Sequence, residues 1–313
     1  MKAFITAEEK MDGLQSRKER TRKNSDLQKK WRTTFLAWGL LLPSMFFLGL
    51  FTIYPMLGSL YNSLFKDDLA TMVPRFVGLK NYTGLFGDTI FLKAFFNNLL
   101  VAACTIFASI ALAVGMAIFA DKAAAGKGFV RVAFFYPTIL PMVAVANIWV
   151  YIYTPIYGLL GYINPSWRIL SNPDTAIWGL IVMLVWKQAG YLMIFYISGL
   201  QGISEELYEA AKMDGSRPVH TFWYVTWPML RPTTLYVSII ALTDAYKMVD
   251  HLYIMTKGGP NNSTNMLLYY IYQVGFDFWD MGKASAMTMV LIMLLLIATC
   301  IHFFVQDKKT FYS

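Results

Sequence analysis

The chain has few of the residues from which catalytic and metal sites are built. Its 313 residues include two cysteines and three histidines, and only 15% of the residues are charged. Cys104 and Cys300 have no Cys-x-x-Cys spacing and both fall within long apolar runs. They therefore support neither a disulfide framework nor a metal site, and we expect both to be small packing residues.

The sequence also lacks the short motifs that bind nucleotides or carry out hydrolysis. It contains no Gly-x-x-x-x-Gly-Lys-Ser/Thr loop, no Gly-x-Ser-x-Gly elbow and no His-Glu-x-x-His pair. A membrane enzyme would need acids, histidines or a nucleophile clustered at the membrane edge, so the scarcity of His and Cys argues against that class. We predict that the chain is not an enzyme and holds no cofactor. If ATP drives it, another subunit binds the ATP.

Apolar residues are abundant instead. They make up 57% of the chain and the mean hydropathy is +0.45, which is typical of a polytopic membrane protein. About 20 apolar residues cross the hydrocarbon as a helix. We therefore predict an all-α fold with six membrane spans, at 34–57, 95–120, 130–153, 176–200, 233–254 and 284–305. The fifth span contains charged residues at three positions.

The basic residues of the loops predict the orientation. Eighteen Lys and Arg lie in the two tails and in the loops after the second and fourth spans, against seven in the other loops. Positively charged loops stay in the cytoplasm. Both termini, and the loop over 201–232, are therefore predicted to be cytoplasmic.

The formal charge of +8 comes mostly from the first 32 residues. Such a tail is attracted to anionic lipid headgroups, and no folded module for reading nucleic acid accompanies it. The tail is also too long and polar for a cleavable signal, so the first span is a membrane anchor. We predict a basic tail over 1–32 and one six-span domain over 33–313.

The loop between the fourth and fifth spans has strong helix signals. Ser204 can cap a helix over 205–213, whose first turn contains Glu205 and Glu206. These acids are more simply a solvated helical turn than an acid–base dyad. Asp214 and Gly215 form a turn pair that ends this helix.

A second short helix is predicted directly after that turn. Ser216 would cap it and Pro218 would lie in its first turn. Pro228 and Pro232 would mark its end. The two helices would fold about Gly215 into a compact protrusion with a small-residue face.

This loop resembles the EAA loop of ABC-importer permeases, the element that docks on the ATPase subunit. Its Ser216 and Trp227 depart from the usual Ala and Leu without removing the hinge or the Glu. The residues that the resemblance assigns to ATPase docking are Glu209, Ala210, Ala211, Asp214, Gly215, Phe222 and Pro228.

A second resemblance lies before the last span. Thr256-Lys-Gly-Gly-Pro, a later Thr264 and a Tyr-rich segment are similar to the corresponding loop of carbohydrate-type permeases, on the maltose and glycerol-3-phosphate larger-subunit side. The segment 76–82 and the region from Pro137 to Gly158 match as well, so the resemblance covers nearly all of the membrane part. It makes this loop a candidate contact for a solute-binding protein, through Gly258, Gly259, Pro260 and Asn261.

The resemblance implies a type I ABC importer transmembrane domain in the bacterial inner membrane. The implied partners are a second homologous permease, an ATPase dimer that binds ATP and Mg, an extracytoplasmic solute-binding protein and membrane lipid. The implied substrate is a sugar, oligosaccharide or polyol derivative. The large external insertion of the maltose permease is absent here.

Charges within the spans are the best pointers to a substrate path, because a charge at the bilayer centre costs about 2.5–3.5 kcal/mol on insertion scales. Asp244, Lys247 and Asp250 are spaced i, i+3, i+6 on the fifth span, so Lys247 can pair with either acid along one helical face. They could pair with one another or with the partner permease, or they could line the path, where a lysine would suit an anionic substrate. The path candidates, including aromatics that could stack on a sugar, are Trp149, Tyr153, Lys187, Tyr191, Asp244, Lys247 and Asp250.

A secondary transporter is the alternative class. It could also have six spans and charges at the midplane. It would not need a pair of docking helices, and the sequence shows no paired broken helices of the kind such transporters use. We therefore favour the ABC permease.

Overall fold

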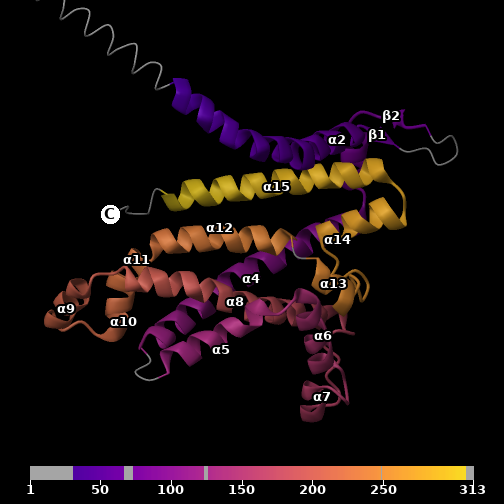
Figure 1. Ribbon diagram of the computed structural model, residues 1–313. Helices are drawn as coiled ribbons and strands as arrows, with labels where there is room; N and C mark the ends of the chain where they lie inside the picture. Colours follow the sequence, from indigo (N-terminus) through magenta and orange to yellow (C-terminus); the bar gives the residue numbers. More distant parts are fainter. Residues whose placement is uncertain (1–30, 67–72, 123–125, 248, 308–313) are drawn as a thin grey trace, which may run out of the picture. The chain divides into compact units, whose positions relative to one another are not determined.

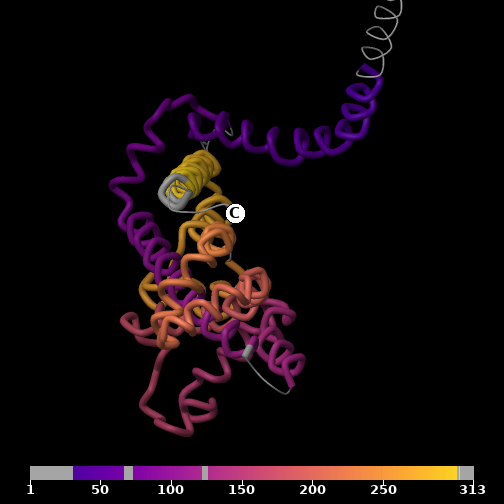
Figure 2. Tube along the Cα trace, turned by 90° about the vertical axis from the view of Figure 1, so that its left-hand side faces the viewer, coloured from indigo at the N-terminus to yellow at the C-terminus, as the bar shows by residue number. Residues whose placement is uncertain are grey.

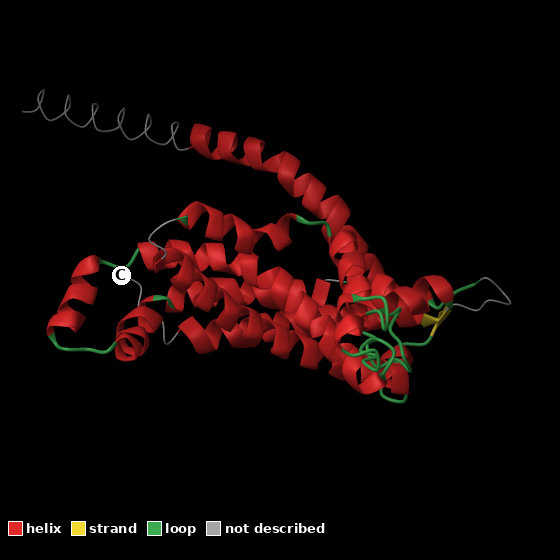
Figure 3. Ribbon diagram, turned by 90° about the horizontal axis from the view of Figure 1, so that it is seen from below, coloured by secondary structure: helices red, strands yellow, loops and turns green. Residues whose placement is uncertain are grey.

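The computed structural model describes residues 31–66, 73–122, 126–247 and 249–307. Helices dominate these residues (Figure 3), and the predicted all-α class is confirmed. The strands in the described part are β1 (Phe65–Lys66) and β2 (Arg75–Phe76), which pair antiparallel with Phe65 opposite Phe76. Nearly all of the predicted basic tail lies outside the described residues.

The chain divides into two compact units, Met1–Ser59 and Leu60–Ser313. The described part of the first unit is helical from Trp31, and this helix runs on to Asn62 over 32 residues. It contains the π-helical turn η1 (Gly49–Ile53) and continues as α2 (Tyr54–Asn62). Its length and apolar sequence fit the predicted first span.

The second unit contains the remaining helices. Its first half consists of α3 (Lys80–Leu85), α4 (Thr89–Lys122), α5 (Lys127–Ile139), α6 (Met142–Tyr153), α7 (Leu159–Ile163) and α8 (Pro173–Gln201). Its middle consists of α9 (Glu205–Met213), α10 (Pro218–Thr221), η2 (Phe222–Thr226), α11 (Trp227–Met229) and α12 (Arg231–Lys247). It ends with α13 (Asp250–Met255), α14 (Leu267–Tyr272), η3 (Gln273–Asp277) and α15 (Met281–Asp307).

Four helices of the described chain are long and apolar enough to cross a membrane: Trp31–Asn62, Thr89–Asp121, Pro173–Gln201 and Met281–Ile301. They match the first, second, fourth and sixth predicted spans. The third is the pair α5 and α6, bent by 97° at a short break. The fifth is divided between α12 and α13. Neither break was predicted from the sequence.

Helix α8 lies at the centre of the second unit, where it packs against α4, α5 and α12. Alanines of α4, including Ala113 and Ala117, pack in one core cluster with Leu192 and Tyr196 of α8. Small residues allow membrane helices to approach closely. At Gly190 the approach is extreme, because a Cβ atom there would collide with the carbonyl oxygen of Phe134 in α5.

The cysteines are both free, and their surroundings differ. Cys104 is half-buried and packs against a core cluster, as expected, whereas Cys300 is exposed. The expectation of a packing role is therefore wrong for Cys300 within this chain.

The helices place two regions of the second unit far apart. Helices α9 and α10 lie at one end, and α6, α7 and α13 lie at the other (Figure 1). The segment 154–172, which includes α7, projects away from the other helices of the second unit (Figure 2). The loop resembling the EAA motif and the Gly-Gly-Pro loop therefore belong to opposite ends, as the predicted orientation requires.

Candidate functional site

The first site is the protrusion formed by residues 204–230, here called the coupling protrusion. Its first helix, α9, begins where the sequence predicts. The Ser204 hydroxyl accepts a hydrogen bond of 3.3 Å from the Glu206 N–H. Glu205 and Glu206 lie in the first turn and Lys212 in the last, which is the charge order that favours a helix dipole.

Helix α9 ends at Gly215, again as predicted. Gly215 has a φ of +72°, in the left-handed region that a side chain disfavours. The Gly215 N–H donates to the Lys212 carbonyl at 3.1 Å, and the Ser216 N–H donates to the Ala211 carbonyl at 2.9 Å. These bonds satisfy the last carbonyls of α9, so the turn is held in one geometry.

The second helix of the protrusion differs from the prediction at its start. Arg217 occupies its N-cap position, and the Ser216 hydroxyl instead accepts a hydrogen bond from Thr221 at 3.2 Å. Pro218 lies in the first turn as expected. The helical run ends at Met229 with a turn at Leu230, between Pro228 in α11 and Pro232 in the first turn of α12, so the two prolines mark its end as predicted.

The π-helical turn η2 explains how the helix passes Pro228. A proline inside a helix removes one N–H and crowds the carbonyl four residues before it. In η2 the Trp227 N–H donates to the Phe222 carbonyl, five residues back, so the chain is locally widened just ahead of the proline. The protrusion therefore leads into α12 with only a turn at Leu230.

The residues assigned to docking divide into two groups. Glu209, Ala210, Asp214 and Gly215 are exposed on the outer side of the protrusion, and Ala211 is half-buried. Phe222 and Tyr208 are also half-buried and pack against the core cluster of α4 and α8. Pro228 is half-buried in the helix itself.

A hydrogen bond and a cavity mark the inner side of the protrusion. The Tyr208 and Thr226 hydroxyls are 3.3 Å apart. Beneath them lies a cavity of about 580 Å³, lined by residues that include Asp121, Lys212 and Phe222. Phe222 therefore supports the protrusion from inside, while α9 presents the outer surface.

Lys187 lies at the break in the third span. Its ammonium donates to the carbonyls of Leu140 at 2.7 Å and Pro137 at 3.1 Å, with a longer contact of 3.5 Å to Thr138. The Thr138 hydroxyl in turn donates to the Lys187 carbonyl at 3.3 Å. Pro141 ends α5 and leaves these carbonyls without helical partners, so Lys187 caps α5 from α8.

The charged face predicted for the fifth span does not exist as a continuous helix. Asp244 and Lys247 belong to α12, Asp250 begins α13, and Met248 between them is not described. Lys247 and Asp250 are exposed and Asp244 is half-buried. Within the described residues no ion pair joins Lys247 to either acid. Asp244 and Lys247 keep their i, i+3 spacing on α12, and the break separates only Asp250 from them.

The three aromatic path candidates lie in the packed interior or at its edge. The Tyr153 ring is buried, and its hydroxyl donates to the Gly179 carbonyl at 3.0 Å. Trp149 packs against Tyr153 with ring centroids 5.2 Å apart and against Trp186 at 5.7 Å. Tyr191 is half-buried and packs edge-on against Phe195. Within the described residues, Tyr153 serves packing.

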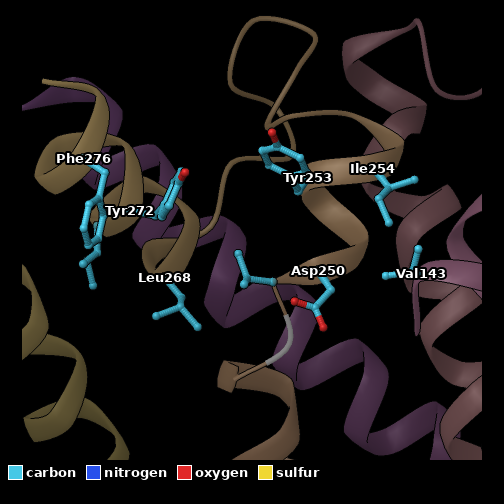
Figure 4. Close-up of a pocket in the computed structure, with 9 residues that line it drawn as sticks. Val143, Asp250, Tyr253, Ile254, Leu268, Tyr272 and Phe276 are labelled. Atoms are coloured by element: carbon cyan, nitrogen blue, oxygen red, sulfur yellow. The ribbon is translucent and has the colours of Figure 1, made fainter. Parts of the chain in front are cut away.

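A second site, missed by sequence reasoning, is a groove between α6, α13 and α14, here called the α13–α14 groove. Its volume is about 540 Å³. Figure 4 shows Asp250, Tyr253 and Ile254 on α13, and Tyr272 and Phe276 across from them; the Asp250 carboxylate and the Tyr253 hydroxyl point in opposite directions. Its lining residues are Val143, Val249, Asp250, Tyr253, Ile254, Leu268, Ile271, Tyr272 and Phe276. The available signal was the spacing of Tyr269, Tyr272 and Phe276 on one helical face.

The Gly-Gly-Pro loop is fixed to the start of α4. The Lys93 ammonium donates to the Asn261 carbonyl at 2.7 Å, and the Asn97 amide donates to the carbonyls of Asn262 and Asn265 at 3.2 and 3.0 Å. Asn261 is exposed, Gly259 and Pro260 are half-buried and Gly258 is buried. Gly258 therefore shapes the loop from within and is not available as a contact.

An ion pair ties the start of α4 to α15. Lys283 and Asp88 are 2.7 Å apart, and the Tyr270 hydroxyl donates to the same carboxylate at 2.7 Å. Partial burial raises the pKa of Asp88. The hydrogen bonds from Lys283, Tyr270 and the Phe91 N–H outweigh that effect and hold the pKa below its ordinary value. This carboxylate therefore stays charged as a structural link.

Comparison with known proteins identifies the family. Residues 109–308 match the family described as "Binding-protein-dependent transport system inner membrane component". The chain is 32% identical over 270 residues to the probable ABC transporter permease protein YurN of Bacillus subtilis, covering 82% of this chain and 90% of that protein. It is 30% identical over 275 residues to the sulfoquinovosyl glycerol transport system permease protein SmoG of Agrobacterium fabrum, covering 85% and 89%. It is 28% identical over 283 residues to the sn-glycerol-3-phosphate transport system permease protein UgpA of the same organism, covering 89% and 97%.

A solved structure shares the fold. A chain of a bacterial ABC transporter involved in the import of the acidic polysaccharide alginate superimposes with a TM-score of 0.78 at 20% sequence identity, covering 90% of this chain and 98% of that one. The family match and the relatives exclude the secondary transporter and the membrane enzyme as alternatives. The chain belongs to the binding-protein-dependent transport system inner membrane component family, and it is a multi-pass permease subunit of an ABC importer, a transport subunit rather than an enzyme.

Proposed function

We propose that this permease subunit imports a sugar, oligosaccharide or polyol derivative. The names of its relatives support this class, since they transport sn-glycerol-3-phosphate and sulfoquinovosyl glycerol, and the structural neighbour takes part in the import of alginate. The proposed working unit is residues 33–313, preceded by a basic tail that contacts membrane lipid.

The coupling protrusion carries the proposal for energy coupling. Helix α9 presents Glu209 and Ala210 outward and is ended by the rigid turn at Gly215. An exposed helix of this kind suits a cleft in an ATPase subunit, and an ATPase dimer would serve this chain together with a second, homologous permease. ATP and Mg would be bound by the ATPases.

The connections of the protrusion suggest how motion would spread. Helix α8 ends at Gln201, and three residues separate it from α9, which begins at Glu205 after its Ser204 cap. The second helix of the protrusion leads into α12 through a turn at Leu230. Closure of the ATPases would therefore displace α8 and α12 together. Because α8 also carries Lys187 and Gly190, its displacement would reach the bend of α5 and α6 and switch the permease between inward- and outward-facing states.

At the opposite end, the Gly-Gly-Pro loop is the proposed contact for the solute-binding protein. Its hydrogen bonds to Lys93 and Asn97 preform it, and Asn261 projects from it. In the proposed orientation this loop faces the outside of the cell and both termini are cytoplasmic.

Reconstitution with the partner subunits tests the proposal. Uptake of a binding-protein-delivered solute should require ATP and should stop when the ATPase loses its catalytic residue. Glu209→Lys should abolish co-purification of the ATPase, whereas Tyr224→Ala, an exposed change on η2, should leave it intact. Uptake that continues with an inactive ATPase would contradict the proposal.

A further inference from the structure

We propose that the cavity beneath the coupling protrusion, here called the protrusion cavity, binds a small soluble organic anion with an apolar part, such as an aromatic carboxylate. The bound anion holds the protrusion against α4 and slows coupled transport. The cavity is lined from α4, α8, α9, α10 and η2, and in the proposed orientation it opens to the cytoplasm. This inference rests on the proposed coupling role of the protrusion and adds a regulatory site to it.

The protrusion cavity has the size and the mixed lining of a small-molecule site. Its volume of about 580 Å³ falls within the range of roughly 300–1,000 Å³ that such sites occupy. Ile118, Leu200 and Phe222 supply apolar surface, and Asp121 and Lys212 supply charge. Hydroxyl groups come from Tyr208, Ser216, Thr221 and Thr226. Polar groups from several elements therefore line the same space as an aromatic ring.

Two hydrogen-bond donors of the lining are left for a ligand. The Thr221 hydroxyl donates to the Ser216 hydroxyl at 3.2 Å, and the Tyr208 and Thr226 hydroxyls pair with each other at 3.3 Å. The Ser216 hydroxyl accepts in its bond, so its own hydrogen can bind a ligand. The Lys212 ammonium makes no hydrogen bond or ion pair within the described residues. Both donors lie at the C-terminal turn of α9.

The charges around the protrusion cavity favour an anion. The Asp121 carboxylate lies 3.8 Å from the Arg131 guanidinium, which offsets its charge and leaves the positive charge of Lys212 in excess. Glu209, one turn earlier on α9, neither lines the cavity nor pairs with Lys212. An ammonium group binds a carboxylate through charge-assisted hydrogen bonds. The carboxylate of the ligand therefore binds Lys212 and Ser216, and its apolar part packs on Phe222.

The position of the protrusion cavity gives binding an effect on coupling. Ile118 and Asp121 belong to α4, whereas Lys212 belongs to α9 of the protrusion, so a ligand bridges the two. Tyr208 and Phe222 already pack against the core cluster of α4 and α8. A ligand shifts a conformational equilibrium toward the state that it binds more tightly. The bound anion therefore resists displacement of the protrusion by the ATPase.

Saturation-transfer difference NMR on the assembled transporter in lipid nanodiscs tests the site. The probes are phenylacetate and indole-3-acetate, each compared with its neutral amide, and empty nanodiscs supply the background. We expect transfer to at least one carboxylate to exceed transfer to its amide about fivefold. No excess for either carboxylate would overturn the site.

The lipid of the nanodiscs separates a soluble anion from a lipid headgroup of the same chemistry. Nanodiscs of phosphatidylcholine and nanodiscs that also contain phosphatidylglycerol should give the same excess. Loss of the excess with phosphatidylglycerol would assign the protrusion cavity to an anionic headgroup and overturn a soluble ligand.

Two matched pairs of variants locate the binding. Lys212→Gln should weaken binding of the carboxylate about fivefold, whereas Lys127→Gln, at an exposed lysine of α5 outside the lining, should leave it unchanged. Ile118→Trp fills the cavity from α4 and should abolish binding. Phe119→Trp, at the exposed neighbour outside the lining, should not. Binding that survives both Lys212→Gln and Ile118→Trp would overturn the site.

Uptake by the same preparation tests the regulatory effect. A saturating carboxylate probe on the ATPase side should slow ATP-driven uptake at least about fivefold, which is the lower end of common allosteric coupling. Ile118→Trp should remove this inhibition. Binding that leaves uptake unchanged would overturn the regulatory role. Uptake without any probe tests the proposed function separately, because ATP-dependent uptake upholds that function even where no probe binds.

Discussion

Replacing Lys187 with methionine tests whether this lysine caps the broken third span or serves an anionic substrate. Methionine has a similar length and no donor, so the carbonyls of Leu140 and Pro137 would lose a hydrogen-bond partner inside the protein. An unsatisfied buried carbonyl costs about 1–3 kcal/mol, so two of them cost roughly 2–6 kcal/mol. The negative end of the α5 dipole would also lose its cation.

We expect Lys187→Met to lower the thermal unfolding temperature of the purified complex by on the order of 5 °C. The ratio of ATP hydrolysed to solute imported should rise, because α8 would no longer be tied to the bend of α5 and α6. Lys187→Arg keeps the charge and several donors and should restore both properties in part. Lys247→Met is the matched control, since Lys247 is exposed and no hydrogen bond from its ammonium is seen in the described structure.

The alternative has a different signature. If Lys187 binds an anionic group of the substrate, Lys187→Met should leave the unfolding temperature and the ATPase coupling unchanged. It should raise KM for the anionic solute alone. That result would refute the capping role.

Three further outcomes are expected. Gly215→Val should weaken co-purification of the ATPase about tenfold without loss of membrane insertion. A β-branched residue at a φ of +72° strains the turn that ends α9. Unchanged co-purification would show that docking does not need this turn. The pKa of Asp88 is lower in the folded state than its ordinary value of 3.8, so the ion pair with Lys283 stabilises the fold above pH 3.8 and this stability is lost as the pH falls further. Between pH 3 and 7, the thermal unfolding temperature should therefore fall more steeply toward acid in the wild type than in Asp88→Asn. Identical profiles would contradict this. An impermeant thiol reagent applied to intact cells should label Asn261→Cys and spare Ser216→Cys, and the reverse pattern would invert the orientation.

The proposed coupling role requires the segment around Pro228 to stay ordered. A loop at Pro228 would uncouple α9 from α12, whereas the widened turn η2 keeps the backbone hydrogen-bonded through the proline. Phe222 and Tyr208 hold the same segment against α4 and α8. The protrusion is therefore joined to α4, α8 and α12, as the proposed lever role requires.

Local sequence signals determined the features that depend on neighbouring residues alone. Long apolar runs predicted the helices at the first, second, fourth and sixth spans, since about 20 apolar residues suffice to cross the hydrocarbon. Ser204 and Gly215 predicted the ends of α9, because a capping hydroxyl and a left-handed glycine act within one helical turn. The motif around Glu209 predicted the family because its residues are contiguous in the sequence and can be recognised without the fold.

Only the tertiary structure decided the features that join distant segments. The 97° bend between α5 and α6 depends on Lys187 and Gly190, which lie about fifty residues further along the chain. The α13–α14 groove is lined by residues from α6, α13, α14 and η3, which are far apart in the sequence, and Asp250 belongs to α13 and not to the helix that carries Asp244. Charge spacing predicts a shared face only on an unbroken helix. A helix can break where partners from distant segments bind the carbonyls that the break frees, and no local sequence pattern encodes those partners.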